Sequence, residues 1–150
     1  MKRIIYMFIF LVFILVLTGC DDVKGNGTLK CNNDIYDYQI SYSDGNVKMV
    51  NLLYKDYNYD KKLENDKLID QYYSKYCGKS YDGYSCSVSL MSKYVYVRTI
   101  YDFDKLSDDD LDNLEKIGLI YNYRKVDKLR SKLEDKIDKI ECEYKENKAK

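Results

Sequence analysis

Polar and apolar residues alternate along several segments of the chain, which is the pattern of β-strands with one buried face. The clearest of these segments are residues 36–42, 47–57, 84–90 and 94–103. Asp44-Gly45 separates the first two segments and Ser92-Lys93 the last two, and such residues permit tight turns. The alternation therefore predicts two antiparallel hairpins. In the first hairpin it places Val47, Met49 and Leu53 on one face.

Three other segments have the helical period, and the residues at their ends are typical of helix termini. These segments are residues 60–77, 107–116 and 124–139. The first is predicted to begin at Asp60 as an N-cap and to end at Gly78 in the left-handed conformation. The second begins at Ser107, whose three following aspartates would face the positive end of the helix dipole, and it stops at Gly118.

Together these elements predict one α+β domain over residues 29–143. Its antiparallel sheet consists of two hairpins, about three helices pack on that sheet, and disulfides staple it. Short segments at 29–32 and 140–144 are further candidate strands. The chain shows no internal repeat and no second domain.

The first twenty residues indicate export. Lys2 and Arg3 precede an uncharged apolar stretch over residues 4–17, which is shorter than the roughly 20 residues needed to span a bilayer. Leu17-Thr18-Gly19-Cys20 resembles a lipobox, so residues 1–19 are expected to be a lipoprotein signal peptide and Cys20 the lipidated first mature residue. An uncleaved apolar helix is the alternative. Residues 20–28 are then a lipidated tether, and residues 144–150 a charged tail.

Charge and composition narrow the possible partners. Without residues 1–19, 131 residues remain, with 23 basic and 25 acidic side chains and a net charge of −2. Such a balance gives no attraction to nucleic acid. The 18 tyrosines could form a binding surface, or they could reflect an AT-rich genome and ordinary strand packing.

Four cysteines remain once Cys20 carries a lipid, and an even number in an exported protein favours disulfides. They are Cys31, Cys77, Cys86 and Cys142. Three pairings are possible, and the sequence does not choose among them. A metal site is the rival interpretation, but the chain has neither a Cys-x-x-Cys pair nor any histidine.

The order of motifs resembles the YehR-like family of small bacterial lipoproteins, which is common in Gram-positive bacteria. The resemblance covers about residues 28–143 and rests on the lipobox, an early Thr-Leu-Lys-Cys strand at residues 28–31, two hairpins, and a last helix that ends Lys-Ile-Glu-Cys at residues 139–142. It implies an α+β fold in the cell envelope and a Cys31–Cys142 disulfide, which leaves Cys77–Cys86 as a local pair. It implies no reaction.

Candidate catalytic groups are few. Without histidine, imidazole-dependent triads and metal sites are absent, and no Ser-x-x-Lys motif occurs. The acids between Asp102 and Asp112 begin like a calcium loop, but Leu106 and Ser107 stand where an oxygen ligand and a glycine belong. A capped helix start accounts for them. We therefore expect no catalytic residue, no metal and no cofactor.

Tyrosines near the Cys77–Cys86 segment are the remaining candidates for binding. Tyr73, Tyr81 and Tyr84 could form a contact patch for an envelope protein or glycan. The alternative is that Tyr72 and Tyr76 pack in the core and the other tyrosines are scattered over the surface. The sequence thus predicts a non-enzymatic protein that binds or scaffolds another component of the cell envelope. It is expected on the extracytoplasmic face of the cell membrane, attached by the lipid on Cys20. The alternatives are an envelope hydrolase that uses two of the acids between Asp102 and Asp112, and a structural spacer without a ligand.

Overall fold

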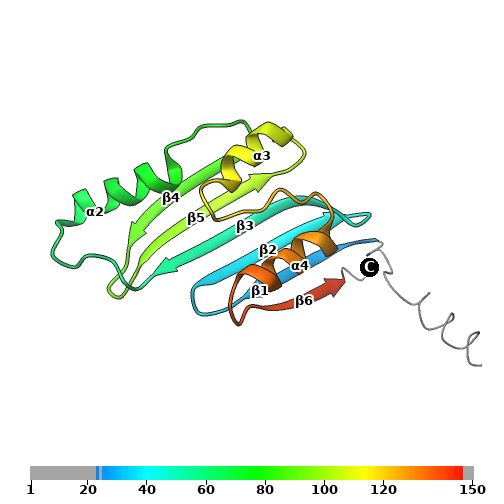
Figure 1. The fold of residues 1–150 in the computed structure, drawn as a ribbon, viewed down its shortest axis with the longest axis horizontal. Helices are drawn as coiled ribbons and strands as arrows, with labels where there is room; N and C mark the ends of the chain where they lie inside the picture. The colour runs from blue at the N-terminus through cyan, green and yellow to red at the C-terminus, as the bar shows by residue number, and fades with distance from the viewer. Residues whose placement is uncertain (1–22, 24, 147–150) are drawn as a thin grey trace, which may run out of the picture.

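A six-stranded antiparallel sheet forms the centre of the computed structural model, which describes residues 23 and 25–146 (Figure 1). The strands are β1 (Asn26–Asn32), β2 (Tyr36–Ser43), β3 (Asn46–Asp56), β4 (Tyr84–Leu90), β5 (Val95–Asp102) and β6 (Glu141–Glu146). Their order across the sheet is β4-β5-β3-β2-β1-β6. The helices are α2 (Asn65–Tyr72), which continues as the π-helical turn η1 (Tyr73–Cys77), α3 (Asp108–Glu115) and α4 (Val126–Lys136).

The α+β class is as predicted, but the sheet is larger than two hairpins. β1 joins the first hairpin, β3 pairs with β5, and β6 returns beside β1. β1 belongs in the sheet because Leu29 and Cys31 alternate with polar residues and are fully buried. β6 likewise directs Cys142 and Tyr144 toward the core, and Glu141, Glu143 and Lys145 outward.

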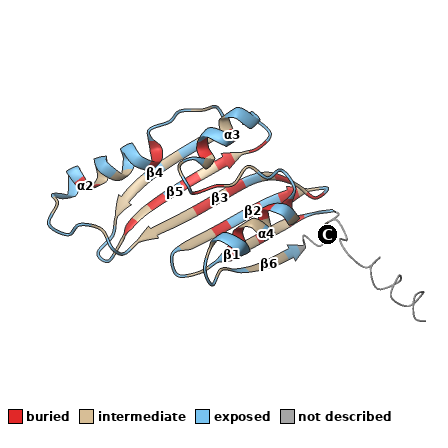
Figure 2. Cartoon of the chain, viewed as in Figure 1, coloured by how far each residue is buried: buried red, intermediate tan, exposed pale blue. Residues whose placement is uncertain are grey.

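Helices cover one face of the sheet. α2 and η1 lie along β4, α3 follows the end of β5, and α4 lies over β1 and β6 (Figure 1). The core lies between these helices and the central strands, where buried residues are concentrated (Figure 2). The opposite face is polar along β2 and β4, where Gln39, Ser41, Ser85 and Ser87 are exposed. Alternation along each strand produces this division.

A bulge in the first hairpin corrects one predicted face. Ser41 pairs with Met49, whereas Tyr42 pairs with Val47, so Lys48 is an extra residue in β3. Side chains change face across such an insertion. Val47 is therefore buried, and Met49, which was predicted to share its face, is exposed. The Lys48 carbonyl accepts a hydrogen bond from the Phe103 backbone N–H at 2.9 Å.

One row of paired residues crosses all six strands and contains three of the four disulfide-bonded cysteines. In register order this row is Cys142, Cys31, Tyr38, Leu52, Thr99 and Cys86. Cys31 is bonded to Cys142 between neighbouring strands, and Cys77 of η1 is bonded to Cys86 of β4. The pairing implied by the family resemblance is confirmed. One disulfide therefore fastens each edge of the sheet.

Helix ends agree with the sequence where local hydrogen bonds define them. The Ser107 hydroxyl accepts from the Asp110 N–H, the Asp110 carboxylate accepts from the Ser107 N–H, and Gly118 has φ +86°. Asp60, by contrast, is not an N-cap, because its carboxylate accepts from the Lys62 N–H in a turn and α2 begins only at Asn65. Gly78 has φ −69°, so the predicted left-handed end is wrong.

The predicted boundaries can be compared with the described residues only in part. β1 begins at Asn26, inside the segment predicted as a tether, and β6 reaches Glu146, inside the predicted tail. Cys20 and residues 1–19 lie outside the described residues. Among residues 23 and 25–146, no helix is long and apolar enough to cross a membrane.

Candidate functional site

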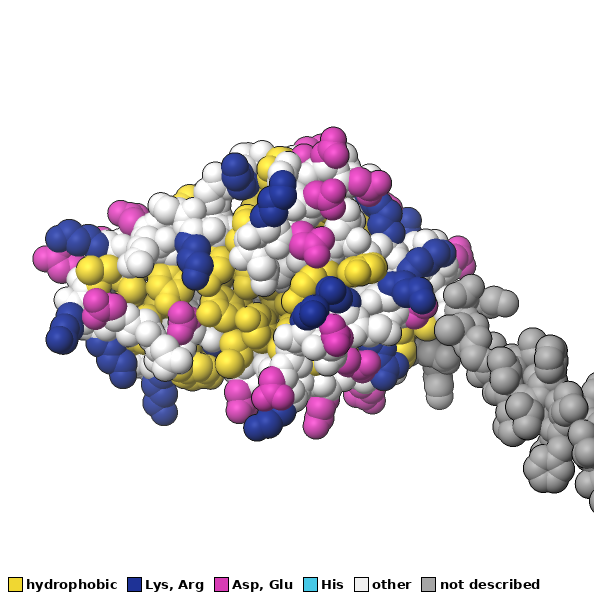
Figure 3. Space-filling model, in the orientation of Figure 1, with side chains coloured by type: hydrophobic (Ala, Val, Ile, Leu, Met, Phe, Trp, Pro, Cys, Tyr) yellow, Lys and Arg dark blue, Asp and Glu magenta, His cyan; other side chains and the backbone are white. Residues whose placement is uncertain are grey.

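The candidate site is the part of the helix-side face that the helices leave uncovered. α2 lies toward one edge of the sheet and α4 toward the other (Figure 1). Hydrophobic side chains, with tyrosine counted among them, gather on the surface between these two helices (Figure 3). The described residues that form this surface include Tyr36, Tyr54 and Tyr72, all half-buried.

Five tyrosines form a continuous row of ring contacts across this face, which we call the tyrosine row. Its members in order are Tyr38, Tyr36, Tyr54, Tyr76 and Tyr72. Successive ring centroids are 6.1, 5.3, 5.6 and 5.9 Å apart. Such distances are typical of favourable aromatic pairs. The row joins the middle of the sheet to the inner side of α2 and η1.

Simple register rules place these rings together. Tyr36 and Tyr38 are two residues apart on β2 and so face the same side, and Tyr54 lies directly opposite Tyr36 on β3. Tyr72 and Tyr76 are four residues apart on α2 and η1, which brings their rings to one side of the helix. The Cys77–Cys86 disulfide then holds η1 against β4.

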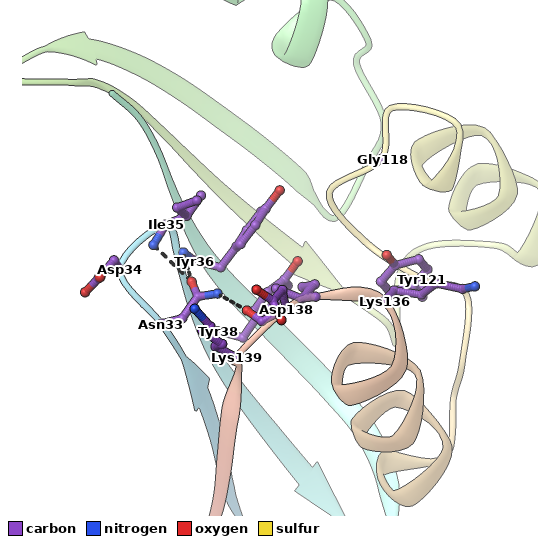
Figure 4. A pocket seen from close by; sticks show the side chains of 11 residues that line it. Asn33, Asp34, Ile35, Tyr36, Tyr38, Gly118, Tyr121, Lys136, Asp138 and Lys139 are labelled. Atoms are coloured by element: carbon purple, nitrogen blue, oxygen red, sulfur yellow. Dashed lines mark hydrogen bonds between the residues drawn. The ribbon is translucent and has the colours of Figure 1, made fainter. Parts of the chain in front are cut away.

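At one end of the row lies an open hollow of about 340 Å³, which we call the α4 hollow. The residues that line it are Asn33, Asp34, Ile35, Tyr36, Tyr38, Gly118, Tyr121, Lys136, Ile137, Asp138 and Lys139. They come from the β1–β2 loop, from β2, from the segment after α3 and from the end of α4 (Figure 4). Its volume is near the lower end of the range found for small-molecule sites.

Hydrogen bonds hold the sides of the α4 hollow in place. The Asn33 side-chain oxygen accepts from the N–H groups of Ile35 and Tyr36 at 2.9 and 2.8 Å, and its amide nitrogen donates to the Asp138 carbonyl at 2.9 Å (Figure 4). The Tyr38 hydroxyl donates to the Leu119 carbonyl at 2.9 Å. A ligand would therefore meet a largely preformed surface.

The phenols of this region stay protonated at neutral pH. Burial raises the pKa of Tyr36, and the neighbouring Tyr76 and Tyr121 raise it further. Burial also raises the pKa of Tyr54 and Tyr72 well above 10.0, and the Tyr72 hydroxyl donates to the Asp56 carboxylate. Protonated phenols are uncharged and can both donate and accept hydrogen bonds. The half-buried Tyr36, Tyr54 and Tyr72 therefore present neutral, hydroxyl-bearing rings at the surface.

The structure brings together only part of the predicted contact patch. Tyr73 and Tyr84 line a second hollow, of about 410 Å³, beside the Cys77–Cys86 disulfide. Tyr73 is 50% exposed, while Tyr84 packs on Tyr101 and donates its hydroxyl to the Tyr76 carbonyl. Tyr81 does not line this hollow and packs against the core.

Most acids between Asp102 and Asp112 interact with neighbouring groups of the fold. Asp104 forms a salt bridge with Lys48 at 2.8 Å, Asp108 pairs with Arg124 at 2.8 Å, and Asp110 completes the cap of α3. None of these acids lines the α4 hollow or the hollow beside Cys77–Cys86. In the described part of the chain, no group of three or more carboxylates, cysteines or histidines could hold a metal ion.

A third hollow lies on the opposite face of the sheet. Asp37, Gln39, Asn51, Leu53, Tyr96 and Arg98 line about 130 Å³ there. One carboxylate oxygen of Asp37 is buried without a hydrogen-bond partner among the described residues, and Arg98 contacts the Asn51 oxygen at 3.4 Å. The hollow is too small to hold more than a few water molecules.

Sequence reasoning missed the residues that define the main site. Tyr76 packs in the core as predicted and Tyr72 is half-buried, but the sequence gives no local reason to single out Tyr36, Tyr54 or Tyr121 as binding residues. The alternating pattern of β2 could have indicated part of the site, because it directs Tyr36 and Tyr38 to the helix-covered face of the sheet. The pairing of Tyr36 with Tyr54 depends on the hairpin register, which the bulge makes hard to predict.

Comparison with known proteins shows limited similarity. No protein-family model matches the chain, and no curated protein matches it. Among solved structures, the NMR structure of the E. coli YehR protein is similar, with a TM-score of 0.40 and 15% identity. The likeness covers 66% of this chain and 74% of that chain. Neither a lipoprotein family nor a function follows from a likeness of this extent.

Proposed function

We propose that this chain is a lipid-anchored protein on the outer face of a bacterial cell membrane that binds an envelope ligand without transforming it. The observation that carries the binding role is the α4 hollow together with Tyr36, Tyr54 and Tyr72, the half-buried members of the tyrosine row. Aromatic side chains with hydroxyl groups are enriched at binding surfaces, because they combine a large contact area with polar groups. Their rings are also held rigidly, which reduces the entropy lost on binding.

The anchor is supported by the sequence of the N-terminal segment. Leu17-Thr18-Gly19-Cys20 follows an apolar stretch with basic residues before it, and the order of motifs resembles YehR-like lipoproteins. The two disulfides support the same location, since such bonds persist in oxidising compartments. Two acyl chains on one cysteine would suffice for stable attachment to a membrane.

The side chains that line the α4 hollow support binding without catalysis. The α4 hollow presents phenols, an amide, two lysines and two carboxylates, and both carboxylates, Asp34 and Asp138, are exposed. A glycosidase needs one carboxylic acid with a raised pKa, which burial or a neighbouring like charge usually provides. Asp34 and Asp138 are both exposed, so neither carboxylate has the burial that a glycosidase acid needs.

One experiment tests the anchor. Protein isolated from membranes is digested without reduction, and the peptides are identified by mass spectrometry. The proposal expects a diacylglyceryl group on Cys20 as the first residue of the chain. A Cys20→Ser variant should leave the membrane fraction. An unmodified Cys20 in membrane-isolated protein would refute the anchor.

A second experiment tests the binding site independently of the anchor. Thermal unfolding of the membrane-extracted protein is measured with and without soluble fragments of enzymatically digested cell envelope. A ligand at about 100 times its Kd stabilises the folded state by about 2.7 kcal/mol, which raises Tm by several degrees. Tyr36→Ala should reduce this rise, whereas Tyr96→Ala on the opposite face should not. No rise with any envelope fraction would refute the binding role.

A further inference from the structure

The charges around the α4 hollow cancel. Two carboxylates, Asp34 and Asp138, and two ammonium groups, Lys136 and Lys139, are exposed along its lining. Equal numbers of opposite charges create no net field that would select an anion or a cation. The phenols add no charge, since they stay protonated at neutral pH. The hollow therefore favours an uncharged ligand.

The backbone below the hollow is already hydrogen-bonded. β2 contributes Tyr36 and Tyr38, and it lies between β1 and β3, with both of which it pairs. The Tyr36 carbonyl also accepts from the Asn33 N–H at 2.9 Å. A peptide that binds as an added strand needs free backbone groups at a sheet edge. A ligand in this hollow must instead be recognised by side chains.

Two hydroxyl groups are available for that recognition. Tyr36 rises from β2 and Tyr121 lies across the hollow, in the segment after α3 (Figure 4). Neither hydroxyl has a hydrogen-bond partner among the described residues. The Tyr38 hydroxyl, in contrast, is already bonded to Leu119. Free phenols that donate and accept, set among apolar ring edges, match a ligand with hydroxyl groups on a hydrocarbon frame.

We infer that the α4 hollow and the adjoining Tyr36–Tyr54 pair of the tyrosine row bind an uncharged oligosaccharide. This inference rests on the proposed function and names the ligand class for the same site. The hollow has room for one or two sugar rings, and Tyr54 extends the contact surface beyond it. Hydroxyl groups of Tyr36 and Tyr121 hydrogen-bond to sugar hydroxyls from two sides.

The experiment uses full-length lipidated protein in detergent micelles and isothermal titration calorimetry. The probes are neutral tetramers of N-acetylglucosamine, glucose and galactose, an anionic galacturonate tetramer, and an uncharged alanine–glycine peptide. The variants are Tyr36→Phe and Tyr121→Phe, which remove one hydroxyl each and keep the ring. The matched control is Tyr96→Phe, because Tyr96 lies on the opposite face of the sheet.

At least one neutral tetramer is expected to bind, and each of the two variants should weaken its binding about three- to tenfold, as expected for one lost hydrogen bond. Tyr96→Phe should leave the affinity unchanged. The inference is overturned if no neutral tetramer binds, if only the anionic tetramer or the peptide binds, or if neither Tyr36→Phe nor Tyr121→Phe weakens binding. If envelope fragments still stabilise the wild type through Tyr36 in those cases, the proposed function stands and only the ligand class fails.

Discussion

Removing the two disulfides one at a time should separate their contributions to stability. The double variants are Cys31→Ala/Cys142→Ala and Cys77→Ala/Cys86→Ala. The pairs are matched in burial, because each joins one buried cysteine to one half-buried cysteine. The loss of sulfur packing should therefore be similar in both variants, and the difference between them reports mainly on the chain segments that the disulfides close.

The sequence separations of the two disulfides set the expected magnitudes. Cys31 and Cys142 are 111 residues apart, and Cys77 and Cys86 are 9 apart. In the chain-entropy model, the long closure contributes about 4.8 kcal/mol and the short one about 2.7 kcal/mol. The Cys31–Cys142 variant should thus lose about 2 kcal/mol more of the free energy of unfolding.

Urea unfolding followed by circular dichroism measures both losses on the same scale. Wild-type protein treated with reductant and alkylated serves as a control in which both disulfides are absent. The reasoning would be refuted if the Cys77–Cys86 variant lost as much free energy as the Cys31–Cys142 variant. That outcome would mean that the docking of η1 on β4, and not the entropy of the unfolded chain, governs the effect.

Three further predictions concern local features of the fold. Ser107→Ala removes the side-chain cap of α3 and should reduce the free energy of unfolding by about 1 kcal/mol in urea, whereas an unchanged midpoint would show that the cap is dispensable. Gly83→Ala should destabilise more than Gly118→Ala in the same assay: both have positive φ, but a Cβ at Gly83 would lie 2.7 Å from the Lys105 Cβ, while Gly118 has open space. Equal losses would mean that only the backbone conformation matters. Burial raises the pKa of Tyr84 from 10.0 to about 12, so the folded state keeps a proton that the unfolded state releases. Stability should therefore be unaffected by this group below pH 10 and fall between pH 10 and 12. A titration of tyrosinate absorbance alongside circular dichroism tests this, and Tyr84→Phe should lessen the fall.

The elements of the fold could be predicted from the sequence because each depends on a local pattern. The alternation over β2 and β5 and the Ser107 cap involve residues only two or three positions apart. The arrangement of strands could not be predicted in the same way. The pairing of β3 with β5, and of β1 with β6, joins segments about 50 and 110 residues apart, for which a single sequence carries no direct signal.

The candidate site illustrates the same limit. The sequence drew attention to Tyr73, Tyr81 and Tyr84 because they are close along the chain. The ring contacts instead join Tyr36 to Tyr54 across a hairpin, and Tyr54 to Tyr76 across the gap to η1. Those contacts depend on register and on where the helix docks, and neither can be read from spacing alone.

The position of β1 has a mechanical consequence for a membrane-anchored protein. If Cys20 holds the chain at the membrane and a ligand pulls on the α4 hollow, the tension runs lengthwise along β1 from Asn26 to the loop at Asn33. β1 is paired on both sides, so the two ladders would carry this load in shear, with many hydrogen bonds strained together. Near the far end of the strand, the covalent link from Cys31 to Cys142 would share the load with β6. We therefore expect the domain to withstand this lengthwise pull on β1 far better than it would withstand a pull that peels one edge strand from the sheet.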